Sequence, residues 1–115
     1  MSNIFSVLEK DFEILESQDA IIKKRNGVVK LDFPNYGVSA VFETKDDFDC
    51  STILTLAKET TIEYTVYGIE GYLETLFTCN IDCFTNKNLW FTFDIEETPD
   101  SETVLIKGWL GKKII

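Results

Sequence analysis

Two cysteines, Cys79 and Cys83, are the first residues in this 115-residue sequence whose type and spacing could do chemistry. Such a pair could bind a metal, form a disulfide or supply a nucleophile. The residues from Leu73 to Cys83, however, alternate between apolar and polar side chains, which predicts an extended strand. Four residues of strand span about 13 Å, whereas a disulfide needs Cα atoms within about 7 Å and zinc needs thiolates at about 2.3 Å. We therefore interpret both thiols as small apolar side chains on the buried face of a strand.

The chain contains no histidine, which is the commonest general base near neutral pH and the commonest metal ligand. A Ser-His-Asp triad, a Cys-His pair and a His-based zinc site are therefore excluded. Catalysis would have to use carboxylates, Lys, Tyr or Cys, and no spacing in the sequence gathers such groups into a site. We predict that the protein is not an enzyme and that it has no catalytic residues, no metal ligands and no cofactor.

Carboxylates gather in two stretches, "ETKDDFDC" at 43–50 and "DIEETPDSE" at 94–102. The first lacks the turn glycine and the distal Glu of a calcium-binding EF-hand loop. A glycosidase-type carboxylate pair is conceivable in the second, but nothing in the sequence places a sugar cleft. Each stretch is interpreted either as a solvated turn or as a surface for a basic partner. The candidate partner-binding residues are Glu43, Asp46, Asp47, Asp49, Trp90, Asp94, Glu96, Glu97, Asp100 and Glu102.

Trp90 belongs to this set because alternation along "LWFTFDIEE" places it on the strand face of Asp94 and Glu96. Phe91 and Phe93 occupy the opposite, buried face. The pattern predicts that Asp94 and Glu96 point toward solvent or a partner, and an exposed Trp beside carboxylates is typical of an interface anchor. The alternative is that both faces of this strand are covered, one of them by the helix.

The net charge of −9, from 20 acidic and 11 basic residues, disfavours binding to nucleic acids and to anionic membrane surfaces. No apolar run approaches the roughly 20 residues needed to span a bilayer. The N-terminal stretch "MSNIFSVLEKDFEILE" has no basic region typical of a signal peptide. Three cysteines, an odd number, fit a reducing compartment. We predict a cytoplasmic protein whose partner is a basic protein and whose oligomeric state is open.

The elements that would position these residues begin with a helix over residues 3–17, where Ile4, Leu8, Phe12 and Leu15 recur at helical spacing. "AIIKKRNGVVKLDF" then predicts two strands joined by an Asn-Gly hairpin turn, with Lys23, Lys24 and Arg25 as a solvated tip. Residues 48–57 fit either a strand or a short helix, and their β-branched content favours the strand.

The fold class predicted is α+β and mostly β, as one domain over residues 1–115. The helix at 3–17 would pack on an antiparallel meander of about seven or eight strands between residues 20 and 110. That sheet could be open, cupped or closed.

The small size, the absence of histidine and the acidic stretches "ETKDDFD" and "DIEETPDSE" resemble bacterial immunity proteins of contact-dependent-inhibition and polymorphic toxin systems. The resemblance is one of character over the whole chain, and no family motif transfers a residue's role. It implies a protein that binds a cognate, basic, nuclease-like toxin and neutralises it by stoichiometric occlusion. The alternatives are a β-barrel-like binder of small apolar ligands, a histidine-free enzyme and a DNA-mimicking inhibitor.

Overall fold

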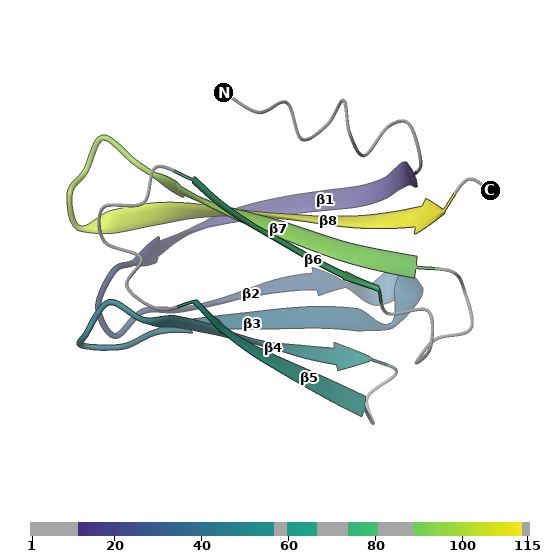
Figure 1. The fold of residues 1–115 in the computed structure, drawn as a ribbon, viewed down its shortest axis with the longest axis horizontal. Helices are drawn as coiled ribbons and strands as arrows, with labels where there is room; N and C mark the ends of the chain where they lie inside the picture. Colours follow the sequence, from purple (N-terminus) through teal and green to yellow (C-terminus); the bar gives the residue numbers. More distant parts are fainter. Residues whose placement is uncertain (1–11, 57–59, 67–73, 81–88, 114–115) are drawn as a thin grey trace.

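The computed structural model describes residues 12–56, 60–66, 74–80 and 89–113 (Figure 1). The mostly β, antiparallel class predicted from the alternation is confirmed. The elements in chain order are β1 (Phe12–Lys23), β2 (Val28–Phe33), the 3-10 turn η1 (Pro34–Tyr36), β3 (Val38–Thr44), β4 (Cys50–Leu56), β5 (Thr60–Val66), β6 (Glu74–Asn80), β7 (Leu89–Glu97) and β8 (Thr103–Lys113).

These strands form two four-stranded antiparallel sheets that lie face to face as a sandwich (Figure 1). One sheet has the order β2-β3-β4-β5, which is a meander of consecutive strands. The other has the order β1-β8-β7-β6, so the first strand pairs with the last. The described residues therefore build neither the single sheet nor the closed barrel that the sequence allowed. For residues 48–57 the strand, rather than the short helix, is confirmed, because Cys50–Leu56 form strand β4.

The predicted helix is wrong for residues 12–17, which belong to β1, while residues 3–11 lie outside the described residues. Strand β1 pairs with β8 over eleven residue pairs, and the register shifts between Ile14 and Glu16. Leu15 is thus the extra residue of a β-bulge, which interrupts the alternation expected of a strand. The interruption leaves apolar residues at a spacing that imitates a helix, and pairing with a distant strand overrides that local preference.

The predicted Asn26-Gly27 hairpin is also wrong, because β1 and β2 belong to different sheets. Asn26 has the positive φ of 53° that such a turn requires, but Gly27 does not. Gly27 is needed for another reason: a Cβ there would lie 2.8 Å from the Lys23 carbonyl oxygen and 2.8 Å from Ile22 Cγ1. The segment 24–27 is therefore a tight corner that carries the chain from one sheet to the other.

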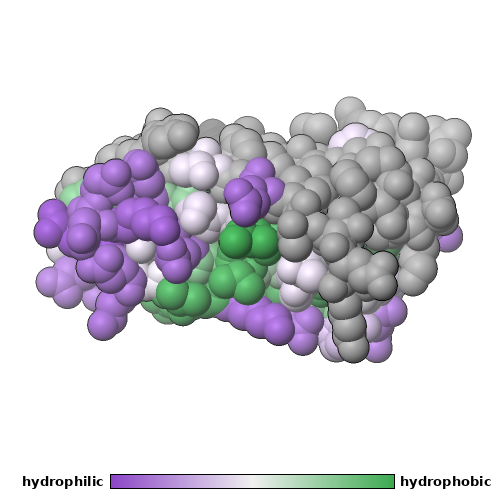
Figure 2. All heavy atoms as spheres, turned by 90° about the horizontal axis from the view of Figure 1, so that it is seen from below, coloured by the Kyte–Doolittle hydropathy of each residue, from purple (hydrophilic) through white to green (hydrophobic). Residues whose placement is uncertain are grey.

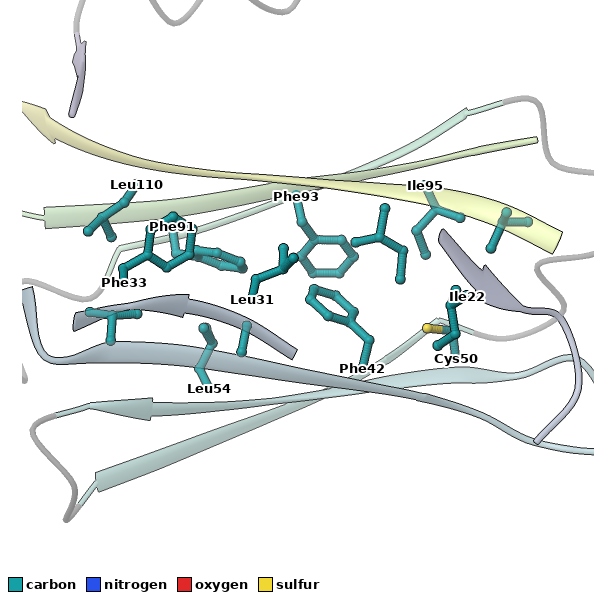
Figure 3. Packing of buried hydrophobic residues seen from close by; sticks show 14 of the residues in the cluster. Ile22, Leu31, Phe33, Phe42, Cys50, Leu54, Phe91, Phe93, Ile95 and Leu110 are labelled. Atoms are coloured by element: carbon teal, nitrogen blue, oxygen red, sulfur yellow. The ribbon is translucent and has the colours of Figure 1, made fainter. Parts of the chain in front are cut away.

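Aromatic rings from both sheets fill the space between them (Figure 3). Phe42 of β3 meets Phe93 of β7 edge-on with ring centroids 5.0 Å apart, and Phe33 of β2 meets Phe91 of β7 at 6.2 Å. Full burial of one such side chain stabilises the fold by about 1.5–3 kcal/mol. Among the described residues, buried side chains of both sheets pack together in the sandwich interior.

The inward side chain of Leu31 on β2 packs directly over Gly108 of β8. A Cβ at Gly108 would lie 2.6 Å from Leu31 Cδ1, so the glycine makes room for a side chain of the opposite sheet. Within the part of the chain described, no helix has the length and apolar character needed to cross a membrane.

Candidate partner-binding site

Three turns meet at one end of the sandwich, and we call this end, residues 24–27, 45–49 and 98–102, the loop end (Figure 1). Backbone hydrogen bonds join the turns across the two sheets. The Lys24 N–H donates to the Glu102 carbonyl at 2.9 Å, and the Thr44 N–H donates to the Gly27 carbonyl at 2.9 Å. Both acidic stretches of the sequence thus come to the same place, on either side of the corner 24–27.

The first acidic turn is held by its own backbone. The Lys45 N–H donates to the Asp49 carbonyl at 2.8 Å, and the Phe48 N–H donates to the Lys45 carbonyl at 3.1 Å. Phe48 has a φ of 65°, a strained value for a bulky residue that the turn and the contacts around it must maintain. The exposed Asp46 accepts a hydrogen bond from Asn26 Nδ2 at 2.5 Å, which fixes this turn to the corner.

Glu43 belongs to the first acidic stretch in the sequence but lies on β3 rather than in the turn. Its carboxylate accepts a hydrogen bond from the Lys45 ammonium. That hydrogen bond is the larger cause, and the negative charge of Glu43 the next, of a raised pKa of the Lys45 ammonium. Glu43 is half-buried, and its carboxylate is already paired with Lys45 within the chain.

The second acidic turn is a compact network of hydroxyl and carboxylate groups. Asp100 Oδ1 accepts a hydrogen bond from the Glu102 N–H at 2.8 Å. The Thr98 hydroxyl lies 2.8 Å from the Asp100 carbonyl oxygen and 2.7 Å from the Thr103 hydroxyl. These contacts hold Asp100 and Glu102 in place while both side chains remain exposed.

A basic corner lies between the two acidic turns, and no local pattern in the sequence indicated this arrangement. Lys24 is only 7% exposed, and its ammonium lies 3.8 Å from the Glu97 carboxylate. The guanidinium of Arg25 stacks 4.4 Å above the centroid of the Phe48 ring. The predicted solvated tip is therefore wrong for Lys24. The acidic turns lie far from the corner in sequence, so only the folded chain brings them to it.

The corner, Phe48 and the second acidic turn line an open hollow of about 590 Å³. Its lining combines three cations, the Phe48 ring and the second acidic turn, with residues Lys23, Lys24, Arg25, Phe48, Asp100, Ser101, Glu102 and Thr103. The hollow thus combines charges of both signs with an aromatic surface.

Three of the predicted partner-binding residues lie away from the loop end. Asp94 is 4% exposed, so the prediction that it faces solvent is wrong. Glu96 is half-buried and lies 3.3 Å from the Lys107 ammonium. Both project from the outward face of β7, which lies between β6 and β8 in the sheet, so a neighbouring strand flanks β7 on each side.

Trp90 is half-buried and lies at the opposite end of β7 from Glu97. Seven residues of strand separate the two by about 23 Å. The prediction that Trp90 shares a strand face with Asp94 and Glu96 agrees with the strand register. Trp90 does not, however, lie beside the exposed acidic turn. The alternative interpretation, with both faces of this strand covered, fits the buried Thr92 and Asp94.

The cysteines give no sign of a metal centre in the residues with described side chains. Cys50 is buried, and burial raises the pKa of its thiol to about 11. No group of three or more Cys, Asp or Glu side chains suited to a metal ion occurs among the described residues. Cys79 lies on strand β6, whereas Cys83 falls outside the described ranges, so the interpretation of that pair stays a prediction.

Comparisons with protein-family models, with curated proteins and with solved structures gave no match.

Proposed function

We propose that this chain is an immunity-type protein that binds a basic, nuclease-like toxin and neutralises it by stoichiometric occlusion. The observation that carries the proposal is the meeting of the two acidic turns at one end of the sandwich, on either side of the corner 24–27 (Figure 1). Asp46, Asp47, Asp100 and Glu102 are all exposed there. Carboxylates gathered in this way steer a positively charged partner toward the loop end and raise its rate of association.

The hydrogen bonds of the loop end support this proposal, because they fix two of these four carboxylates before a partner arrives. Asn26 holds Asp46, and the Glu102 N–H holds Asp100. A preorganised surface loses less conformational entropy on binding, so more of its interaction energy appears as affinity.

The basic corner contributes to specificity under this proposal. Arg25, held on the Phe48 ring, places a cation between the two acidic turns. A uniformly basic surface would meet this cation unfavourably, whereas a cognate partner would place a carboxylate opposite it. The proposal therefore calls for one matched partner rather than for any basic protein.

The experiment that tests the proposal captures the partner and then measures protection. The tagged chain is used to capture proteins from the lysate of its source cell at low and at high salt. We expect one basic protein at near-equal stoichiometry, less of it at high salt, and growth arrest when it is expressed alone in a host cell. Co-expression of this chain should restore growth. A captured protein that is harmless alone, or whose toxicity this chain does not relieve, would contradict the proposal.

A further inference from the structure

The outward face of the β2-β3-β4-β5 sheet carries exposed apolar side chains. Val28 is 62% exposed and Ile53 is 40% exposed, while Val41 is half-buried directly opposite Ile53. Figure 2 views the molecule from the side of this sheet and shows hydrophobic side chains gathered beside a strongly hydrophilic end. The apolar face is thus continuous with the charged part of the surface.

Carboxylates border this apolar face on the side of β5 and of the first acidic turn. A hollow of about 330 Å³ on the face is lined by Glu43, Lys45, Asp49, Ser51, Thr52, Ile53, Glu63 and Thr65. Three carboxylates therefore surround it with a single lysine, and that lysine is already hydrogen-bonded to Glu43. Lys30 lies on the other side of the patch, across from Val41 on β2.

The cross-strand register defines what this face could accept. Ile53 has Val41 opposite it on β3 and Glu63 opposite it on β5. Glu43 and Ser51 form the adjacent cross-strand pair. An apolar side chain of a partner would rest on Val41 and Ile53, and a neighbouring basic side chain would reach the exposed Glu63. Apolar contact surrounded by charge is the usual anatomy of a protein interface.

We infer that this face is a docking surface for a segment of a basic protein whose apolar side chains alternate with Lys or Arg. The inference rests on the proposed function, and it names the surface and the side-chain chemistry of the partner. A second copy of this chain fits poorly, because a two-fold contact through the face would bring Glu43, Asp49 and Glu63 against one another.

The test uses defined peptides and the full-length chain labelled with ¹⁵N. A short peptide that alternates lysine and isoleucine is titrated to about 1 mM, a concentration that detects millimolar affinity. Two matched peptides serve as controls. In the first, serine replaces isoleucine, and in the second, glutamate replaces lysine. We expect the lysine–isoleucine peptide to shift the amide signals of Val41, Ile53 and Glu63, and to bind on the order of tenfold tighter than the other two.

Substitution of one exposed isoleucine should weaken this binding, and substitution of another should not. Ile53→Lys should lower the affinity for the lysine–isoleucine peptide on the order of tenfold. Ile21→Lys is the matched control, because Ile21 is 62% exposed on a strand of the other sheet. The control should change the affinity by less than about twofold.

Three outcomes would overturn the inference. They are no peptide-induced shift on this face, equal binding of the glutamate–isoleucine peptide, and a wild-type chain that sediments as a dimer which Ile53→Lys dissociates. Shifts confined to residues 45–49 and 98–102 would remove this face from the interface and leave the loop-end proposal standing. The growth experiment tests the proposed function separately, since it does not depend on where a peptide binds.

Discussion

Thr44 is the residue that fastens the corner 24–27 to the body of the sandwich. Its hydroxyl donates to the Lys23 carbonyl at 2.7 Å and accepts from the Gly27 N–H at 2.8 Å. Thr44→Val keeps the shape and removes both hydrogen bonds, which leaves two backbone groups without partners. We expect a loss of about 2–3 kcal/mol in the free energy of unfolding.

The control for this substitution is Thr44→Ser, which keeps the hydroxyl and loses one methyl group. It should cost about 0.8 kcal/mol, the value of one buried methyl group. Urea unfolding of both variants measures the difference. A loss in Thr44→Val no larger than the loss in Thr44→Ser would contradict this account, because the valine variant keeps the methyl group and lacks only the hydroxyl.

Cys50 predicts a pH dependence in the alkaline range. Burial raises the pKa of its thiol from 9.0 to about 11 in the folded chain. As the pH rises, the unfolded chain therefore loses this proton first. The stabilisation is complete below about pH 9 and is lost as the pH approaches 11. Wild type should lose more stability between pH 8 and 10 than Cys50→Ala does, by about 1 kcal/mol.

Urea unfolding at the two pH values measures this difference. Alkylation at pH 8 provides a second readout, because the lower thiolate fraction should make Cys50 react about a hundredfold more slowly in the folded chain than after unfolding. Parallel pH profiles for wild type and Cys50→Ala would contradict the account of this thiol.

The sequence predicted correctly that carboxylates in the two turns are exposed. It did not predict which charged residues near them are buried. Asp46, Asp47, Asp100 and Glu102 are exposed as predicted. Asp94 is buried, because the outward face of a central strand is flanked from both sides. Lys24 is buried, because the corner turns it toward Glu97. Alternation gives the face of a strand on which a side chain lies, and burial depends on the strands beside it.

At the scale of elements, the Gln18 side chain links the edge strands of the two sheets. Its amide nitrogen donates to the Asp32 carbonyl, and its Oε1 accepts from the Asp32 N–H at 3.3 Å. Gln18 of β1 thereby makes the two hydrogen bonds that a neighbouring strand would make with β2. Gln18→Leu should lower the free energy of unfolding by about 1 kcal/mol, because the contact is exposed.

Amide exchange at Asp32 reports on this contact directly. It should become faster in Gln18→Leu, while Gln18→Glu, which keeps an acceptor for the Asp32 N–H, should retain most of the protection. Unchanged exchange in the leucine variant would show that the amide does not protect this edge.

The close approach of the two sheets at Gly108 gives a prediction about packing. Gly108→Ala would place a methyl group 2.6 Å from Leu31 Cδ1, and the overpacking should cost about 1–3 kcal/mol. In a Leu31→Val background the same substitution should cost about 1 kcal/mol less, because the smaller side chain leaves room. A double-mutant cycle by urea unfolding measures this coupling. Additive losses would mean that Leu31 does not set the limit.

The sequence predicted strands well where alternation was clear and failed where pairing decided the outcome. The residues of β3 alternate between buried and less buried positions along the whole strand, as predicted. β1 was mistaken for a helix because its bulge at Leu15 disrupts the alternation. The Asn-Gly pair resembled a hairpin, although β1 pairs with β8, a strand about ninety residues away. Local spacing contains no information about so distant a partner.

At the scale of the whole molecule, the sandwich turns two distant acidic stretches and a basic corner into one surface. Strands β1, β3 and β7 end there, and β2, β4 and β8 begin there, so the six strand ends bring their turns together (Figure 1). The sequence predicted the acidic stretches as separate candidates. Their meeting follows from antiparallel pairing and from the corner 24–27, which no local pattern revealed.

The central proposal is that the loop end recruits a basic partner by charge. The variant Asp47→Asn/Glu102→Gln removes one exposed carboxylate from each acidic turn and keeps the side-chain shapes. The control Glu13→Gln/Asp32→Asn removes two exposed carboxylates toward the other end of the sandwich. Both variants have the same net charge, so a difference between them reports position alone.

The measurement that tests the proposal most directly is the association rate of the captured partner with wild type and with these two variants, at low and at high ionic strength. The loop-end variant should associate about three- to tenfold more slowly than the control at low ionic strength, and the three rates should converge at high ionic strength. Equal rates for the two variants at low ionic strength would contradict the proposal that the loop end is where the partner binds.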